Sequence, residues 1–171
     1  AIGYALDRVT IASLATNDLC EVTDTFWTSD ISPPGTDRTI YTYNPTKAEQ
    51  LLDDAGYTAD PSGERFSIEL LTRRGEAEET IVGDLIEDYL SEVGITVTRQ
   101  LVDFATQLEL TSNHNYDMSL TKRWVQTFWT YQLFHSDWII PGQNFANSVY
   151  FDNPEMDATF DSWLVETDST K

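Results

Sequence analysis

The sequence has little cysteine, little histidine and few basic residues. Cys20 is the only cysteine among 171 residues, so no internal disulfide can form, and we expect its side chain to be a small buried hydrophobe. His114 and His135 are the only histidines, and neither has a second ligand at helical spacing, so no metal site is expected. No apolar run reaches the roughly 18 residues of a membrane-spanning helix, and no signal segment opens the sequence.

The shortage of positive charge is pronounced. Asp and Glu number 29 against 10 Lys and Arg, which gives a formal net charge of -19. Such a surface repels nucleic acid and anionic lipid, so we expect neither as a partner. The acids suit either a solvated surface, as in proteins of saline habitats, or a docking face for a cationic partner. Because they are spread along the whole chain, we favour the solvated surface and predict that stability rises with salt.

Motifs for nucleotide binding and catalysis are absent. The sequence contains no G-x-G-x-x-G, no G-K-[ST] loop and no G-x-S-x-G elbow. Adjacent acids such as Asp53-Asp54 and Glu78-Glu79 fall where solvated helix faces are expected, not on opposite sides of a cleft. We therefore expect no bound cofactor and find no case for an enzyme.

Helix and strand patterns alternate after an N-terminal helix and a long loop from Thr16 to Tyr41. Asn44 and Pro45 can begin a helix that Gly56 ends, and Asn153 and Pro154 can begin the last one. We expect helices at 45–55, 81–93, 104–110 and from 154, and strands at 66–70, 95–98 and 116–121. The last helix has an apolar stripe that we expect to be buried: Met156, Phe160, Trp163 and Leu164. This order predicts an α/β fold, a parallel-type βαβαβ sheet flanked by helices.

Basic residues follow the ends of the first and third strands. Arg73 and Arg74 follow one, Lys122 and Arg123 the other, and parallel sheets bind ligands beyond these ends. Aromatic residues come directly after: Trp124, Phe128, Trp129 and Tyr131. Cations beside aromatic faces suit a carboxylate-bearing or planar ligand. Equally, Arg73 and Arg123 could pair with neighbouring acids while the aromatics form core, and the residues leave both interpretations open.

Five segments carry a family resemblance. They are AIGYALDR at 1–8, YNPTKAEQLLDDAGY at 43–57, SEVGITVTR at 91–99, YDMSL at 116–120 and NSVYFDNPEMD at 147–157. In this order and approximate spacing they resemble the second lobe of the family 5 extracellular solute-binding proteins, the dipeptide, oligopeptide and nickel binders. The resemblance covers almost the whole chain.

The resemblance implies one lobe of a two-lobed periplasmic-binding-protein-like fold. Residues 1–171 would be a single α/β lobe excised from a larger protein, without the first lobe and the C-terminal return. The whole protein would be extracytoplasmic, either periplasmic or a lipid-anchored lipoprotein at the cell surface. It would close on a peptide or similar small solute and deliver it to the membrane permease of an ABC importer.

The same resemblance assigns a ligand site. Trp124 matches the family's cleft aromatic, and with the strand-end residues it gives the expected ligand contacts: Trp124, Arg123, Arg73, Phe128 and Trp129. The acid that can hold a peptide's amino group in the family has no counterpart in 122–129, so the solute stays open among peptide, oligosaccharide and metal chelate. The alternative is a free-standing acidic protein-interaction module, against which the uncapped first helix argues.

Overall fold

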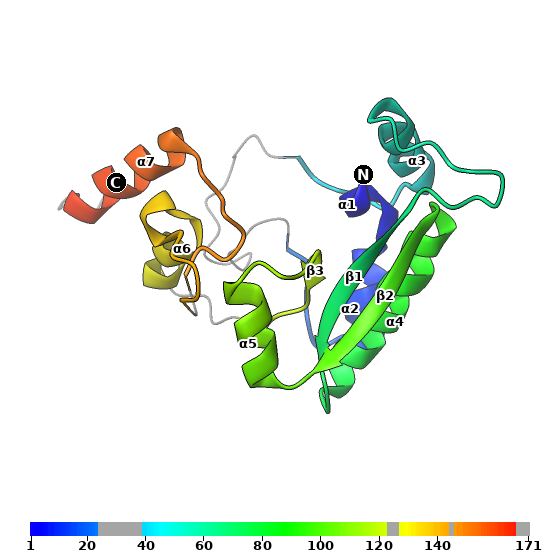
Figure 1. The fold of residues 1–171 in the computed structure, drawn as a ribbon, viewed down its shortest axis with the longest axis horizontal. Coiled ribbons are helices and arrows are strands. Elements are labelled where there is room, and N and C mark those ends of the chain that lie inside the picture. The colour runs from blue at the N-terminus through cyan, green and yellow to red at the C-terminus, as the bar shows by residue number, and fades with distance from the viewer. Residues whose placement is uncertain (24–38, 123–126, 144–145, 167–171) are drawn as a thin grey trace. The chain divides into compact units, whose positions relative to one another are not determined.

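The computed structural model describes residues 1–23, 39–122, 127–143 and 146–166, which form two compact units (Figure 1). Unit 1 comprises Ala1–Asp103 and Asp117–Thr121, and unit 2 comprises Phe104–Tyr116 and Lys122–Lys171. The helices of unit 1 are α1 (Ile2–Ala5), α2 (Arg8–Thr16), α3 (Pro45–Asp54) and α4 (Ala77–Glu92), and its strands are β1 (Phe66–Arg73), β2 (Ile95–Val102) and β3 (Met118–Ser119).

The three strands form one parallel sheet in the order β2-β1-β3. β1 pairs with β2 from Phe66↔Ile95 to Arg73↔Val102, and it pairs with β3 at Leu70↔Met118. The α/β class and the parallel βαβαβ sheet flanked by helices are confirmed.

The third strand is shorter than the sequence predicts. The backbone N–H of Glu69 in β1 donates to the side-chain carboxylate of Asp117, at 2.8 Å. In a longer β3, this N–H would bond to a backbone carbonyl of the neighbouring strand instead. Pairing continues beyond the strand, because Leu120 N–H donates to the carbonyl of Leu71. Tyr116, which we expected inside this strand, belongs instead to unit 2.

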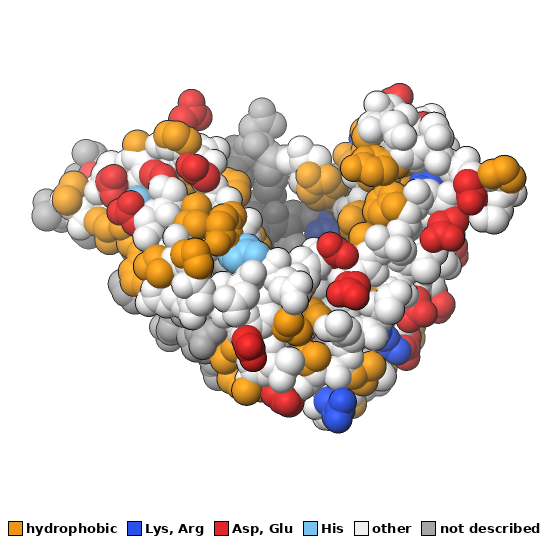
Figure 2. All heavy atoms as spheres, in the orientation of Figure 1, with side chains coloured by type: hydrophobic (Ala, Val, Ile, Leu, Met, Phe, Trp, Pro, Cys, Tyr) orange, Lys and Arg blue, Asp and Glu red, His pale blue; other side chains and the backbone are white. Residues whose placement is uncertain are grey.

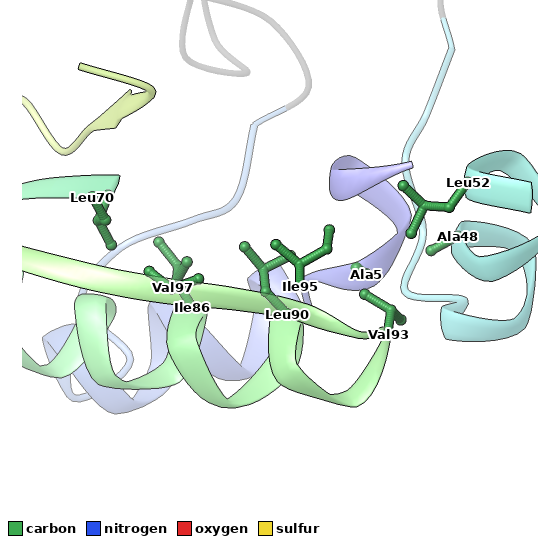
Figure 3. Packing of buried hydrophobic residues seen from close by; sticks show 9 residues of the cluster. All are labelled: Ala5, Ala48, Leu52, Leu70, Ile86, Leu90, Val93, Ile95 and Val97. Carbon is green, nitrogen blue, oxygen red and sulfur yellow. The ribbon is translucent and has the colours of Figure 1, made fainter. Parts of the chain in front are cut away.

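The core of unit 1 lies between the sheet and α4 (Figure 3). Ile95 and Val97 of β2 lie against Ile86 and Leu90 of α4, and all four side chains are buried. Ala5 of α1 and two residues of α3 extend this cluster along the chain. Fully burying one Val, Leu or Ile side chain contributes about 1.5–3 kcal/mol, so this layer holds unit 1 together.

The predicted N-terminal helix is two helices. α1 ends at Ala5, and Asp7 caps α2 by accepting hydrogen bonds from the backbone N–H and the hydroxyl of Thr10. The Thr10 hydroxyl lowers the pKa of Asp7 most, with the backbone N–H acting in the same direction. Asn44 caps α3 as predicted, because its side chain accepts from Lys47 N–H at 3.0 Å.

Helix α4 approaches the sheet most closely at Gly83. A Cβ built there would lie 2.8 Å from Nη1 of Arg99 and 3.4 Å from Cγ2 of Thr72. Arg99 lies on the α4 side of β2, donates to the carbonyl of Thr80 and pairs with Asp84. The buried face of α4 therefore includes Gly83, whereas Ile81, where we expected the helix to begin, is 38% exposed.

Unit 2 consists of short helices. They are α5 (Phe104–Ser112), α6 (Thr127–Phe134), the 3-10 turn η1 (Ser136–Trp138) and α7 (Pro154–Val165). Asn153 caps α7 by accepting from the N–H groups of Glu155 and Met156, as predicted. The sequence patterns gave no indication of α6 or η1.

Two predictions about burial are wrong. No residue of α7 is buried, and the supposed inner stripe leaves Met156 37%, Trp163 43% and Leu164 51% exposed. Cys20 is exposed, because it lies in the irregular segment after α2 and not in the core.

The surface and the helices give two further observations. Figure 2 shows Asp and Glu side chains on both units and few Lys or Arg side chains on the face it draws. None of the helices in the described ranges combines the length and apolar character needed to cross a bilayer.

Candidate ligand site at the strand ends

The carboxyl ends of the three strands meet at one edge of the sheet. Arg73, the last residue of β1, pairs in register with Val102, the last residue of β2. Leu71 pairs with Ser119 at the end of β3. Because all strands are parallel, the segments that follow them leave from the same edge, where α/β sheets bind ligands.

Arg73 is fixed at this edge by Glu79 of α4. Its Nε and Nη2 donate to Oε1 of Glu79 at 2.8 and 2.6 Å, and its backbone N–H donates to Oε2 at 2.8 Å. The two side chains are 17% and 5% exposed. A carboxylate in the first turn of a helix is also favoured by the helix dipole. This pair therefore attaches the end of β1 to the start of α4.

Glu79 is a residue whose role we mispredicted. Its neighbour Glu78 is exposed, as expected for a solvated helix face, but Glu79 points inward and is 4% exposed. A buried carboxylate is costly unless it is paired, and Arg73 supplies both charge and hydrogen bonds. A signal exists in the sequence, because Glu79 lies four and seven residues before Gly83 and Ile86, on the buried face of α4.

Arg74 attaches the connection between β1 and α4 to the end of β2. Its backbone N–H donates to the carbonyl of Val102 at 2.8 Å, and its Nη2 donates to the carbonyl of Leu101 at 3.2 Å. Gly75 follows with a φ of +85°, which a residue with a Cβ rarely adopts. The β1–α4 connection thus holds one arginine partly buried and the next one exposed.

The remaining predicted ligand contacts lie in unit 2. Arg123 and Trp124 fall outside the described residues. Phe128 and Trp129 belong to α6, and their side chains are outside the described part of that helix. Arg73 belongs to unit 1, so a common site for all five residues stays a prediction.

Tyr131 of α6 packs inside unit 2. Its ring contacts Trp138 of η1, Phe160 of α7 and the ring of His135, with centroid distances between 4.7 and 6.4 Å. Of the two interpretations that the sequence left open, ligand contact or core, these contacts favour core for Tyr131.

A polar network missed by the sequence analysis joins α6, η1 and α7. His135 is 3% exposed, and its Nδ1 accepts from the N–H of Asp137. Asp157 of α7 accepts from both the backbone N–H and the hydroxyl of Ser136, at 3.0 and 2.6 Å. The Ser136 hydroxyl is the main cause that lowers the pKa of Asp157. Nε2 of His135 lies 3.4 Å from Oδ1 of Asp161.

Asn147 closes the same network from the following loop. It is 1% exposed, donates to the carbonyls of His135 and Phe151, and accepts from the N–H of Phe151.

The other histidine, His114, also lies in unit 2. Burial lowers the pKa of His114, whose ring lies edge-on to Tyr150. Across the residues that the structure describes, no three or more His, Cys, Asp or Glu side chains are grouped to hold a metal ion.

The chain matches a known protein family. Residues 1–143 match the model of bacterial extracellular solute-binding proteins, family 5 Middle. The chain is 30% identical over 135 residues to the oligopeptide-binding protein AppA of Bacillus subtilis. That alignment covers 73% of this chain and 24% of AppA.

Solved structures share the fold over 99% of the chain. The structure of Bacillus subtilis AppA in complex with a nonapeptide matches with a TM-score of 0.84 and 26% identity, covering 99% of this chain and 35% of AppA. NikA from Brucella suis in complex with Fe(III)-EDTA matches with a TM-score of 0.81 and 22% identity, covering 99% and 36%. An oligopeptide-binding protein of Thermotoga maritima with bound mannohexaose matches with a TM-score of 0.78 and 18% identity, covering 99% and 35%. The chain thus spans about a third of the length of each protein.

Proposed function

Because the chain belongs to the bacterial extracellular solute-binding proteins of family 5, we propose that it is one lobe of the solute-binding component of an ABC importer. The observation that carries this proposal is the family match over residues 1–143. The whole protein closes on a solute between two lobes, works outside the cytoplasm as a periplasmic or membrane-anchored protein, and passes the solute to a membrane permease. Its role is binding and delivery, without chemistry on the solute.

The strand-end edge is where we place the solute. Arg73 is held there by Glu79, and Arg123 with the aromatic residues Trp124, Phe128 and Trp129 completes the proposed contacts. A guanidinium recognises carboxylates, and aromatic faces accept planar groups or apolar sugar faces. The related structures contain a nonapeptide, a metal chelate and an oligosaccharide, so these three classes are the candidates to test.

A thermal-shift screen of the full-length protein against these classes tests the proposal. A solute at 100 times its Kd stabilises the folded state by about 2.7 kcal/mol, which a melting curve detects. We expect one class to raise the melting temperature, and we expect residues 1–171 alone to bind no solute with submicromolar affinity, since half of the cleft is absent. Submicromolar binding by the isolated chain would contradict the two-lobe proposal.

Substitution of Trp124 tests the site itself. A tryptophan in the cleft, replaced by Ala, should weaken solute binding by about 1 kcal/mol with little loss of stability. A core tryptophan replaced by Ala would cost about 3–5 kcal/mol of stability. Melting and binding of Trp124→Ala, measured on the same full-length preparation, separate the two. A large loss of stability with normal binding by the folded fraction would remove Trp124 from the site.

A further inference from the structure

His135 is a buried titratable side chain at the start of η1. Its Nδ1 accepts a hydrogen bond from the backbone N–H of Asp137, at 3.1 Å. A ring nitrogen that accepts a hydrogen bond carries no proton, so this bond assigns the proton of the neutral imidazole to Nε2. In this form His135 caps η1, because its side chain satisfies a backbone N–H that the turn leaves without a partner.

The other ring nitrogen of His135, Nε2, lacks such a bond. It is buried, and no acceptor among the described residues meets it with the geometry of a hydrogen bond. Oδ1 of Asp161 on α7 lies 3.4 Å away, which is close enough for an ion pair with a charged ring. Buried polar atoms in proteins are nearly always hydrogen-bonded, so the unpaired Nε2–H needs a physical reason.

Carboxylates from two elements lie around the ring of His135. Besides Asp161 at Nε2, Oδ2 of Asp137 in η1 and Oδ1 of Asp157 in α7 each lie 3.9 Å from Nδ1. From α6, the ring of Tyr131 packs against the imidazole with a centroid distance of 4.7 Å. Both nitrogens of the ring therefore have negative charge within ion-pair distance, although the neutral imidazole carries no charge to pair with it.

We propose that His135 is a proton-sensitive junction between η1 and α7. The neutral ring holds the N–H of Asp137 and leaves Nε2 unpaired. A proton added at Nδ1 turns this acceptor into a donor, so the bond from Asp137 N–H is lost and both ring nitrogens donate toward carboxylates, Nε2 toward Asp161. Histidine is the side chain that ordinarily changes charge between pH 5 and pH 8, so this is the range in which to look for the exchange.

The junction lies directly after α6. Phe134 is the last residue of this helix, and the N–H of His135 donates to the carbonyl of Tyr131, so the backbone of His135 is bonded to the helix end. Helix α6 also includes Phe128 and Trp129, two of the proposed solute contacts. Protonation therefore changes the contacts at one end of the helix that carries them. The junction makes no use of a solute, so a failure of the proposed function would leave it intact.

The backbone amide of Asp137 reports the state of the ring. In the full-length protein labelled with 15N-aspartate, we expect the NMR signal of this amide to follow a single protonation step between pH 8 and pH 5. Carboxyl groups ordinarily titrate near pH 4, below this range. The protection of the amide against hydrogen exchange, corrected for the intrinsic effect of pH, should fall about 5-fold or more as the bond to Nδ1 is lost. An Asp137 amide that is insensitive to pH in this range would overturn the proposal.

Matched variants identify the groups that cause the step. His135→Gln should abolish it, because an amide side chain binds no proton in this range. Asp161→Asn removes the carboxylate beside Nε2 and should move the step to lower pH by about half a unit or more. Glu155→Gln removes the same charge from an exposed position of α7 and should leave the step in place. A step that persists in His135→Gln, or equal midpoints for Asp161→Asn and Glu155→Gln, would contradict the proposal.

Discussion

Units 1 and 2 are stabilised by different kinds of side chain. Among the described residues, every buried hydrophobic side chain except that of Ala146 belongs to unit 1. The buried side chains of unit 2 are mostly polar: Gln107, Thr111, Ser112, Thr130, His135 and Asn147. Unit 1 therefore depends on apolar packing, whereas the described part of unit 2 combines hydrogen bonds between side chains and loop backbone with the aromatic contacts around Tyr131. Substitutions at matched positions can test this contrast.

The largest expected effect is in the apolar core of unit 1. Leu90 is fully buried between α4 and the sheet, and Leu90→Ala should lower the free energy of unfolding by about 2–5 kcal/mol, because it removes apolar contacts and leaves a cavity. Leu14→Ala is the control, since Leu14 is 54% exposed and should cost about 0.5 kcal/mol or less. Urea unfolding followed by circular dichroism measures both. Similar losses for the two variants would show that unit 1 is not organised around this core.

The next effect is in the polar interior of unit 2. Asn147→Ala removes both hydrogen bonds to Phe151 and the one to the carbonyl of His135, and should cost about 2–3 kcal/mol because buried backbone groups lose their partners. Asn113→Ala is the matched control, because the exposed Asn113 side chain donates only to the carbonyl of Glu109. Hydrogen exchange of residues 135–151 localises the loss. No difference between the variants would mean that the network does not stabilise unit 2.

The contrast also explains what the sequence could predict. In unit 1, apolar residues at helical and strand spacing, such as Leu90 and Ile95, correctly predicted α4, β1, β2 and the parallel sheet. In unit 2, α6 was missed and the face of α7 was assigned wrongly. The inward-facing residues there are the half-buried Asp157 and the buried His135, which are held by hydrogen bonds that no periodicity encodes. A hydrophobic pattern identifies the apolar side of a helix, but it does not identify which surface the helix meets.

At the candidate ligand site, too, the sequence predicts the position of a residue but not the surface or partner that it meets. The strand-end position of Arg73 follows from the predicted parallel sheet, and the structure confirms that position. Its partner could not be chosen from sequence, because Glu78 and Glu79 are both acids in the first turn of α4 and only one of them points inward. The direction of a side chain near a helix start depends on where the helix axis meets the sheet, which is a tertiary property.

A smaller effect, dependent on pH, is expected at Asp157. The hydrogen bond from Ser136 lowers the pKa of Asp157 in the folded protein, so the folded state binds fewer protons there than the unfolded state. The resulting stabilisation is present above the unfolded pKa, near 3.8, and is lost as the pH falls through the folded value. Asp157→Asn should therefore be less stable than wild type at pH 7, with a difference that shrinks at acid pH. Urea unfolding from pH 7 to pH 3, with the exposed Asp152→Asn as control, measures this; a constant difference would exclude the ionised form as the cause.

The smallest effect concerns the close approach at Gly83. Replacing glycine by alanine within a helix normally stabilises it by up to about 1 kcal/mol, but here the new Cβ meets Nη1 and Cδ of Arg99, at 2.8 and 3.0 Å. Because the guanidinium must move from Thr80 and Asp84, Gly83→Ala should give none of the usual gain and a slight loss of stability. In an Arg99→Ala background the clash with the guanidinium is absent, and the same substitution should recover part of the gain. A double-mutant cycle by urea unfolding measures the coupling, which should be about 0.5–1 kcal/mol for residues in contact. A full gain in the wild-type background would mean that α4 lies farther from the sheet than Gly83 implies, and that the core of unit 1 is less tightly packed at this end.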